Sequence, residues 1–210
     1  MSGVAGSDPR EVVRRGYDEV AERYLEFTGP HIPTRFRWLR RALPLIRPGS
    51  AVVDLGCGAM PATRELVEEG HTLVGVDLSI EQLRMARRAT GGRTALVLAD
   101  ITDFAVRPGS LGAVVSMWAL LHVPRRAQPA LFASVARWLE PGGVFLCSLG
   151  LTDDPGSIEN FLGTPMFFSH FDGASTTAMV GDAGLVVVEA DEVEEPDGTR
   201  APWVLARRPA

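Results

Sequence analysis

A glycine turn and the acidic residue that follows it are spaced as in binding sites for nucleosides. The short apolar run 51–55 leads into Gly56-Cys57-Gly58, where glycine lets the backbone approach a ligand closely. Asp77 stands 21 residues after Gly56, at the end of the next apolar run. A carboxylate at that distance is placed to accept hydrogen bonds from ribose hydroxyls. The turn alone is weak evidence, but together with Asp77 it predicts a ligand with a nucleoside part.

Two features of the same turn favour an adenosyl ligand other than a dinucleotide. Pro61 stands where the G-x-G-x-x-G pattern of dinucleotide sites has its third glycine. Asp54 lies two residues before Gly56, and a carboxylate there would repel a pyrophosphate but attract an ammonium group. S-adenosylmethionine carries an ammonium group, a carboxylate and a sulfonium. A second interpretation is that Asp54 accepts hydrogen bonds from loop N–H groups, and both roles can coexist.

Two of the four histidines are candidates for a general base, because the ordinary pKa of histidine suits proton transfer near neutral pH. His122 follows the fourth expected strand, at the edge where ligands bind in such sheets, and its alternative role is that of a supporting or capping residue. His170 lies in the aromatic segment 167–171. We expect one of these two to be the base, with His170 favoured. His31 is a weaker candidate, and we expect His71 to lie away from the site.

Strands that alternate with helices must position these residues. The apolar runs predict buried strands at 51–55, 72–77, 95–100, 113–117 and 144–149. Capping signals and apolar periodicity predict helices from Asp8 to about Gly29, then at 34–46, 61–69, from Ser79 onward, and at 125–139. This alternation implies a parallel sheet with helices on both faces.

The last 60 residues break that rhythm. Residues 151–172 are expected to hold no strand, and a helix is expected at 173–181. Strands at 185–190 and 203–206, joined through Pro196-Asp197-Gly198, are too close for a crossover helix. They should form an antiparallel hairpin that extends the parallel sheet.

Composition narrows the class of protein. The chain has 210 residues, a formal net charge of −5, and 46% hydrophobic residues, so a single globular domain without a nucleic-acid or anionic-membrane surface is expected. Two cysteines are too few for a disulfide framework, and no cluster of metal ligands is visible. No apolar stretch is long enough to span a membrane, and the first residues do not resemble a secretion signal. These features favour a cytoplasmic protein.

The sequence resembles the class I S-adenosylmethionine-dependent methyltransferases of the small-molecule type. The resemblance runs from about Tyr17 to Ala206 and rests on five motifs in the family's order. They are VVDLGCG at 52–58, GVDLS at 75–79, LADIT at 98–102, AVVSMWALLHVP at 113–124 and LEPGGVFLCSLG at 139–150. It implies a Rossmann-like, mostly parallel seven-stranded sheet with helices on both faces and a C-terminal antiparallel hairpin. A single domain would then comprise a helical cap at 1–48, a cofactor-binding core at 49–150, an acceptor-side insertion at 151–172, and a C-terminal helix and hairpin at 173–210.

The resemblance also implies the roles of individual residues. Gly56 and Gly58 would approach the methionine part of S-adenosylmethionine, Asp77 would hold its ribose, and Asp100 with the Ile101 amide would take the adenine. Met117 and Trp118 would line the pocket, and Tyr17 would close over it. The residues expected to contact the cofactor are Tyr17, Asp54, Gly56, Cys57, Gly58, Asp77, Leu78, Gln82, Asp100, Ile101, Met117, Trp118 and His122.

One position departs from the family pattern. Met60 stands where relatives usually have a third glycine, and its Cβ disfavours the positive φ that glycine adopts. The path of this loop and the affinity for the cofactor are therefore open at this point.

We expect a methyltransferase that acts on O, N or S of a small-molecule acceptor and releases S-adenosylhomocysteine. Compact size and an aromatic-rich insertion support this expectation. Two alternatives remain: a related fold with non-methylating chemistry, such as a cyclase or a carboxymethyl transferase, and a non-catalytic protein that binds the cofactor and a partner protein. The sequence does not indicate the oligomeric state.

Overall fold

The described strands form one seven-stranded sheet in the order β3-β2-β1-β4-β5-β9-β8. The computed structural model describes residues 8–150, 152–195, 198 and 200–210. The strands are β1 (Ala51–Leu55), β2 (Thr72–Asp77), β3 (Ala95–Leu98), β4 (Leu111–Ser116), β5 (Leu139–Ser148), β8 (Val186–Glu194) and β9 (Arg200–Arg207). Strands β1 to β5 are parallel, and β9 pairs antiparallel with both β5 and β8. The expected fold class and C-terminal hairpin are confirmed, while Pro196 and Asp197 of the expected turn lie outside the described residues.

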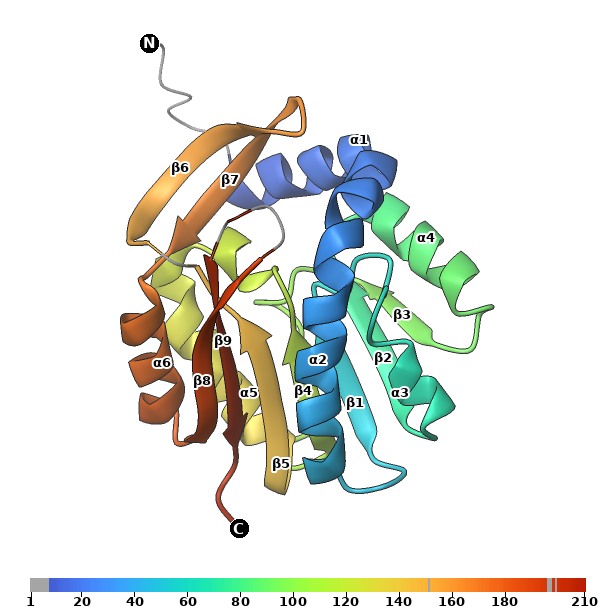
Figure 1. Ribbon diagram of the computed structural model, residues 1–210, viewed down its shortest axis with the longest axis vertical. Coiled ribbons are helices and arrows are strands. Elements are labelled where there is room, and N and C mark those ends of the chain that lie inside the picture. The colour runs from blue at the N-terminus through green and yellow to red at the C-terminus, as the bar shows by residue number, and fades with distance from the viewer. Residues whose placement is uncertain (1–7, 151, 196–197, 199) are drawn as a thin grey trace.

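Helices cover both faces of this sheet (Figure 1). On one face, α2 (Ile32–Ala42), α3 (Glu65–Glu68) and α4 (Ile80–Ala89) contribute Leu39, Leu66 and Leu83 to one buried apolar cluster. On the other face, α5 (Gln128–Trp138) and α6 (Gly173–Asp182) contribute Phe132 and Val180 to a second cluster. The strands between them are apolar on both sides, as expected for a parallel sheet with two covered faces.

Helix α1 (Pro9–Thr28) crosses the end of the sheet instead of packing on a face (Figure 1). Asp8 caps its first turn by accepting the N–H of Arg10, and a proline occupies the first helical position. Glu11, three residues after Asp8, stands at the position of the acidic residue in a capping box, but its carboxylate binds Arg14 and Arg15 instead. A short 3₁₀ turn, Gly29–His31, joins α1 to α2. Helix α1 therefore covers the end of the sheet, and α2 packs on one of its faces.

The expectation that residues 151–172 hold no strand is wrong. Strands β6 (Asp154–Phe161) and β7 (Thr164–His170) form a separate antiparallel pair beside α1 (Figure 1). Their two-residue turn is Leu162-Gly163, with φ values of 52° and 91°. A turn of this length usually carries Asn-Gly or Asp-Gly, so the leucine concealed the hairpin from the sequence.

Helix α1 rests directly on β7. A Cβ on Gly16 would lie 2.7 Å from Cε of Met166 and 3.1 Å from the carbonyl oxygen of Pro165, so glycine favours this close approach. The hydroxyl of Thr164 donates to the Glu19 carboxylate at 2.9 Å. Val13, Met166 and Phe167 form a small apolar cluster of their own. The roof over the end of the sheet is therefore built jointly by α1 and β7.

Several element boundaries differ from the expected ones. The helix expected at 34–46 ends at Ala42 and continues as the 3₁₀ turn Leu43–Leu45, because Pro44 cannot continue an α-helix. The helix expected at 61–69 is reduced to α3, and β5 begins at Leu139, five residues earlier than expected. None of the described helices combines the length and the apolar character needed to cross a membrane.

Met60 adopts the positive φ that its side chain disfavours. Its φ is 55°, and its side chain is fully buried. The backbone N–H of Met60 donates to the carbonyl of Cys57 at 2.9 Å, which closes the turn. The expectation that methionine would not easily take this conformation is wrong here, because core packing of the side chain offsets the backbone strain.

Candidate active site

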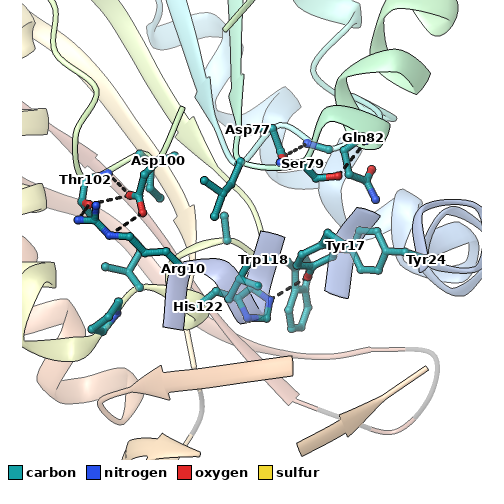
Figure 2. Close-up of a pocket in the computed structure, with 18 residues that line it drawn as sticks. Arg10, Tyr17, Tyr24, Asp77, Ser79, Gln82, Asp100, Thr102, Trp118 and His122 are labelled. Carbon is teal, nitrogen blue, oxygen red and sulfur yellow. Dashed lines mark hydrogen bonds and ion pairs between the residues drawn. The ribbon is translucent and has the colours of Figure 1, made fainter. Parts of the chain in front are cut away.

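A cavity opens at the carboxyl ends of β1, β2 and β4, where the strand order reverses. Such a reversal is the usual ligand site of an open parallel sheet. The cavity is lined by Arg10, Val13, Tyr17, Tyr24, Gly56, Gly58, Asp77, Leu78, Ser79, Gln82, Asp100, Ile101, Thr102, Trp118, Ala119, His122, Val123 and Pro124. Figure 2 shows these side chains between α1 and the strand ends. Ten of the thirteen residues predicted to contact the cofactor are among them.

The glycine turn is shaped by a close approach and by a hydrogen bond. Gly56 has a φ of 70°, and a Cβ at this position would lie 2.2 Å from the Cβ of Ala119. Gly58 has a φ of 51°, and its N–H donates to Oδ2 of Asp77 at 2.8 Å. Both glycines are therefore needed by the local geometry, and the turn is held against the acidic residue that the sequence pairs with it.

Asp77 is buried and keeps part of its capacity to accept hydrogen bonds. Its Oδ1 accepts the N–H of Ser79 at 2.9 Å, and its Oδ2 accepts the N–H of Gly58. Burial raises the pKa of Asp77 to about 6, although the hydrogen bonds from Ser79 and Gly58 oppose that shift. A carboxylate has about four lone-pair positions, so two remain for hydroxyl groups of a ligand in the cavity.

Asp54, Cys57 and Met117 lie beside this first cavity and not in it. They line a smaller space that shares Gly56 with the first cavity. Oδ2 of Asp54 accepts the hydroxyl of Thr63 at 2.6 Å, and burial raises the pKa of Asp54 to about 7. The structure thus supports the interpretation of Asp54 as a buried acceptor for the loop, through a side-chain hydroxyl and not through loop N–H groups.

Arg35, which the sequence did not single out as a cofactor residue, lines the same small space. It is only 7% exposed, and its Nε has no hydrogen-bond partner. Within the described part of the chain, no carboxylate lies within ion-pair distance of its guanidinium. A buried cation without a partner is costly, so this side chain is suited to meet an anionic group of a ligand.

Asp100 is already engaged by its neighbours. Its Oδ1 accepts the N–H and the hydroxyl of Thr102 at 2.7 and 2.6 Å, and its Oδ2 lies 3.0 Å from Nε of Arg10. Figure 2 shows Arg10 reaching across the cavity from α1 to this carboxylate. Arg10 also binds Asp103 at 2.7 Å. The N-terminal helix is therefore held to the far wall of the cavity by an ion pair.

Tyr17 and His122 meet between α1 and the turn after β4. The Tyr17 hydroxyl lies 2.8 Å from Nε2 of His122, and Nδ1 of His122 lies 2.7 Å from the carbonyl oxygen of Phe167. A carbonyl only accepts, so Nδ1 carries the proton and Nε2 accepts the Tyr17 O–H. Burial lowers the pKa of His122 to about 4, and burial raises the pKa of Tyr17 well above its usual range. Both groups are therefore neutral at pH 7.

A second cavity of about 190 Å³ adjoins the first. It is lined by Tyr17, Tyr24, Phe27, Thr28, His31, Arg35, Trp118, Leu121, His122, Phe161, Phe168 and Arg200. The two cavities share Tyr17, Tyr24, Trp118 and His122. Trp118 has a φ of 64°, and its backbone N–H donates to the hydroxyl of Ser148 at 2.7 Å, which holds the backbone that carries the indole at the boundary.

The structure does not bring His170 into either cavity. Its ring packs on Gly150, and its Nδ1 binds the carbonyl oxygen of Thr152. The placement favours His122 over His170, against the preference drawn from the sequence. His31 lines the second cavity, and His71 lies in neither. Phe161 of β6 and Phe168 of β7 line the second cavity, and the acceptor-side role expected for this segment stays a prediction.

Residues 52–143 match a family model described as a methyltransferase domain. This segment contains the glycine turn, Asp77, Asp100 and His122. Among curated proteins, a ubiquinone biosynthesis O-methyltransferase of Thiobacillus denitrificans is 33% identical over 153 residues, which are 68% of this chain and 63% of the relative. Phosphoethanolamine N-methyltransferase 1 of Zea mays is 34% identical over 107 residues, which are 49% of this chain and 21% of the relative. The matched part of the chain thus spans less than two thirds of either relative.

Solved structures share the fold. Magnesium protoporphyrin IX methyltransferase from Synechocystis superposes with a TM-score of 0.74 at 18% identity, covering 98% of this chain and all of the other. The 1,6-didemethyltoxoflavin-N1-methyltransferase of Burkholderia thailandensis, solved with its acceptor and S-adenosylhomocysteine, gives a TM-score of 0.70 at 21% identity and covers 100% and 94% of the two chains. The shared fold, the match of residues 52–143 to a methyltransferase-domain model and the five motifs in order are those of the class I S-adenosylmethionine-dependent methyltransferases.

Proposed function

We propose that the protein transfers the methyl group of S-adenosylmethionine to a small-molecule acceptor. The observation that carries this proposal is the pair of adjoining cavities that meet at Tyr17, Trp118 and His122. A two-substrate transfer requires two binding sites whose contents touch at one point. The curated O- and N-methyltransferases and the solved small-molecule enzymes support the reaction class.

The residues of the first cavity fit the chemistry of this cofactor. The free lone pairs of Asp77 suit the ribose hydroxyls, and Asp100 with the Ile101 amide suits the adenine edge. The guanidinium of Arg35 is buried beside Gly56, and no carboxylate of the described residues lies within ion-pair distance, so it suits the carboxylate of the methionine part. When bound, S-adenosylmethionine supplies a methyl group made electrophilic by a positively charged sulfur.

The protein itself aligns the two substrates, excludes water from the reaction and accepts one proton. Helix α1 and the β6–β7 hairpin roof the junction of the two cavities, so a reaction there is shielded from water. The neutral His122 has its Nε2 directed at Tyr17, which places a proton acceptor at the boundary. An acceptor that carries a proton, such as a hydroxyl, can release it to the Tyr17 oxygen while the Tyr17 proton passes to Nε2 of His122.

The test is turnover with S-adenosylmethionine labelled in its methyl group, against a panel of phenols, carboxylates, amines and thiols. Transfer of the label to an acceptor, reduced at subsaturating cofactor when Asp77 is replaced by asparagine, is the expected result. Binding of S-adenosylmethionine without transfer to any acceptor would favour a non-methylating chemistry on the same fold. Failure to bind the cofactor at all would overturn the proposal.

A further inference from the structure

The second cavity has aromatic walls. Tyr24 and Phe27 come from α1, Phe161 from β6 and Phe168 from β7. Phe161 contacts Tyr24, Phe27 and Phe168 with ring centroids 6.1, 5.5 and 5.9 Å apart, in edge-to-face arrangements. A cavity of about 150 Å³ accommodates benzene, so about 190 Å³ suits one ring with small substituents.

The charges around this cavity have one sign. Arg35 and Arg200 line it, and none of its described lining residues is acidic. An aromatic wall alone would also suit an organic cation, through the attraction of ring faces for positive charge. Two guanidinium groups without a carboxylate in the lining oppose a cation and favour an anion.

The two arginines have different surroundings. Arg35 is buried beside the glycine turn and is suited to the cofactor's carboxylate, as proposed above. Arg200 stands at the start of β9, and its side chain is 57% exposed. Its ion pair with Glu192 is 3.3 Å long, and a half-exposed pair of this kind contributes little free energy. An anionic ligand can therefore replace Glu192 as the partner of Arg200 at modest cost.

We infer that the acceptor is a flat hydroxylated aromatic acid, held with its ring against Phe161 and Phe168, its carboxylate toward Arg200, and its hydroxyl toward the Tyr17–His122 pair. This inference rests on the proposed function, because it assigns the acceptor of that reaction. Arg200 is a specificity-determining residue in this arrangement. The hydroxyl faces the Tyr17–His122 pair, in which His122 carries its proton on Nδ1, so recognition and proton removal occur at opposite ends of one ring.

The test is binding of three matched probes to the full chain saturated with S-adenosylhomocysteine: 3,4-dihydroxybenzoate, its methyl ester and 3,4-dihydroxybenzylamine. Calorimetry should show the acid binding about tenfold more tightly than the ester and the amine binding most weakly. R200Q should weaken binding of the acid about three- to tenfold and leave binding of the ester unchanged, as expected for the loss of one partly exposed charge-assisted contact. Glu192→Gln, which releases Arg200 from its ion pair, should strengthen the acid two- to threefold, by roughly the small free energy of an exposed pair.

Arg37→Gln is the matched control, because Arg37 is exposed on α2 and lines neither cavity. Three results would each overturn the inference. The amine could bind as tightly as the acid or more tightly, the ratio of acid affinity to ester affinity could be unchanged in R200Q, or none of the probes could bind. Methyl transfer is scored separately with the labelled cofactor. Preferential binding of the acid without transfer to any acceptor would leave the binding preference in place and overturn the proposed function.

Discussion

The Tyr17 hydroxyl and Nε2 of His122 lie 2.8 Å apart although 105 positions separate them in the chain. Their rings meet edge to face, with centroids 5.3 Å apart. On its other side, His122 donates from Nδ1 to the carbonyl of Phe167 in β7. One imidazole therefore links the N-terminal helix, the turn after β4 and the acceptor-side hairpin, and its two hydrogen bonds assign its tautomer.

His122→Ala should lower kcat by about 10²–10⁴-fold for an acceptor that must lose a proton, because this is the usual contribution of a general base. Tyr17→Phe removes only the hydroxyl and should cost less, about tenfold. The kcat of His170→Ala should stay within a factor of three of the wild-type value, since His170 lines neither cavity. The measurement is single-turnover kinetics under conditions where transfer is rate-limiting. A His122→Ala enzyme that retains a third of the wild-type rate would contradict the role of His122.

Asp77→Asn should weaken binding of S-adenosylmethionine at least tenfold. The amide nitrogen has no lone pair for a ribose hydroxyl, and a hydrogen bond to a charged acceptor contributes roughly 1.5–3 kcal/mol. Calorimetric titration gives the affinity, and circular dichroism checks that the fold survives. Asp182→Asn, an exposed change on α6 outside both cavities, should bind like the wild type. Unchanged affinity in Asp77→Asn would contradict the assignment of Asp77 to the ribose.

The affinity for the cofactor should fall as the pH drops through about 6. Burial raises the pKa of Asp77 to about 6, so its carboxylate is mostly ionised at pH 7.5 and mostly protonated at pH 5. Only the ionised form accepts at all its lone pairs, and it also attracts the positively charged sulfur. Dissociation constants at pH 5, 6, 7 and 8 should therefore rise toward low pH in the wild type. In Asp77→Asn this rise should largely disappear, and a rise of the same size in the variant would assign it to another group.

Asp54→Asn should reduce the pH dependence of folding stability. The pKa of Asp54 is about 7 in the folded chain and near 3.8 when unfolded, so between these values the folded state binds the proton more strongly. Stability should accordingly decrease as the pH rises from 4 to 7. Urea unfolding at pH 5 and pH 8 should show that decrease reduced in Asp54→Asn by on the order of 1–3 kcal/mol. Asp182→Asn should keep the wild-type decrease.

Met60→Gly should destabilise the protein even though glycine suits a φ of 55°. Relief of the left-handed conformation gains about 1–2 kcal/mol, whereas truncating a fully buried methionine costs about 2–5 kcal/mol. The net loss, about 1–3 kcal/mol, is measurable by urea unfolding. Gly70→Ala isolates the backbone effect, since Gly70 has a φ of 84° and open space around its Cβ position. A more stable Met60→Gly protein would show that strain outweighs packing at this turn.

Sequence reasoning located the parts of the site whose chemistry and spacing are local. The glycine turn, Asp77 and Asp100 each end or follow a strand of the parallel sheet, so a strand assignment brings them together. Arg35 was missed as a cofactor residue because its isolation from carboxylates depends on tertiary packing. Arg10 and Arg200 were missed for a similar reason, since the sequence alone does not distinguish an arginine that lines a cavity from one that is exposed to solvent.

The acceptor side was harder to predict than the cofactor side. His170 was favoured as the base because it stands among phenylalanines, yet antiparallel pairing places it at the end of β7 against Gly150. Residues two apart in a strand share a face, so His170 lies on the same face of β7 as Phe168, but at the last position of the strand, where its Nδ1 binds the carbonyl oxygen of Thr152. Without recognition of the β6–β7 hairpin, this position at the strand end is not visible in the sequence.

The shared wall of the two cavities has a thermodynamic consequence. Tyr17, Tyr24, Trp118 and His122 line both cavities, so a ligand that immobilises them in one cavity also orders the wall of the other. Once the first ligand has ordered this wall, binding of the second ligand loses less conformational entropy. Linkage makes the effect reciprocal: each ligand tightens the binding of the other by the same factor. The protein should therefore bind an acceptor more tightly when the cofactor is bound than when it is absent.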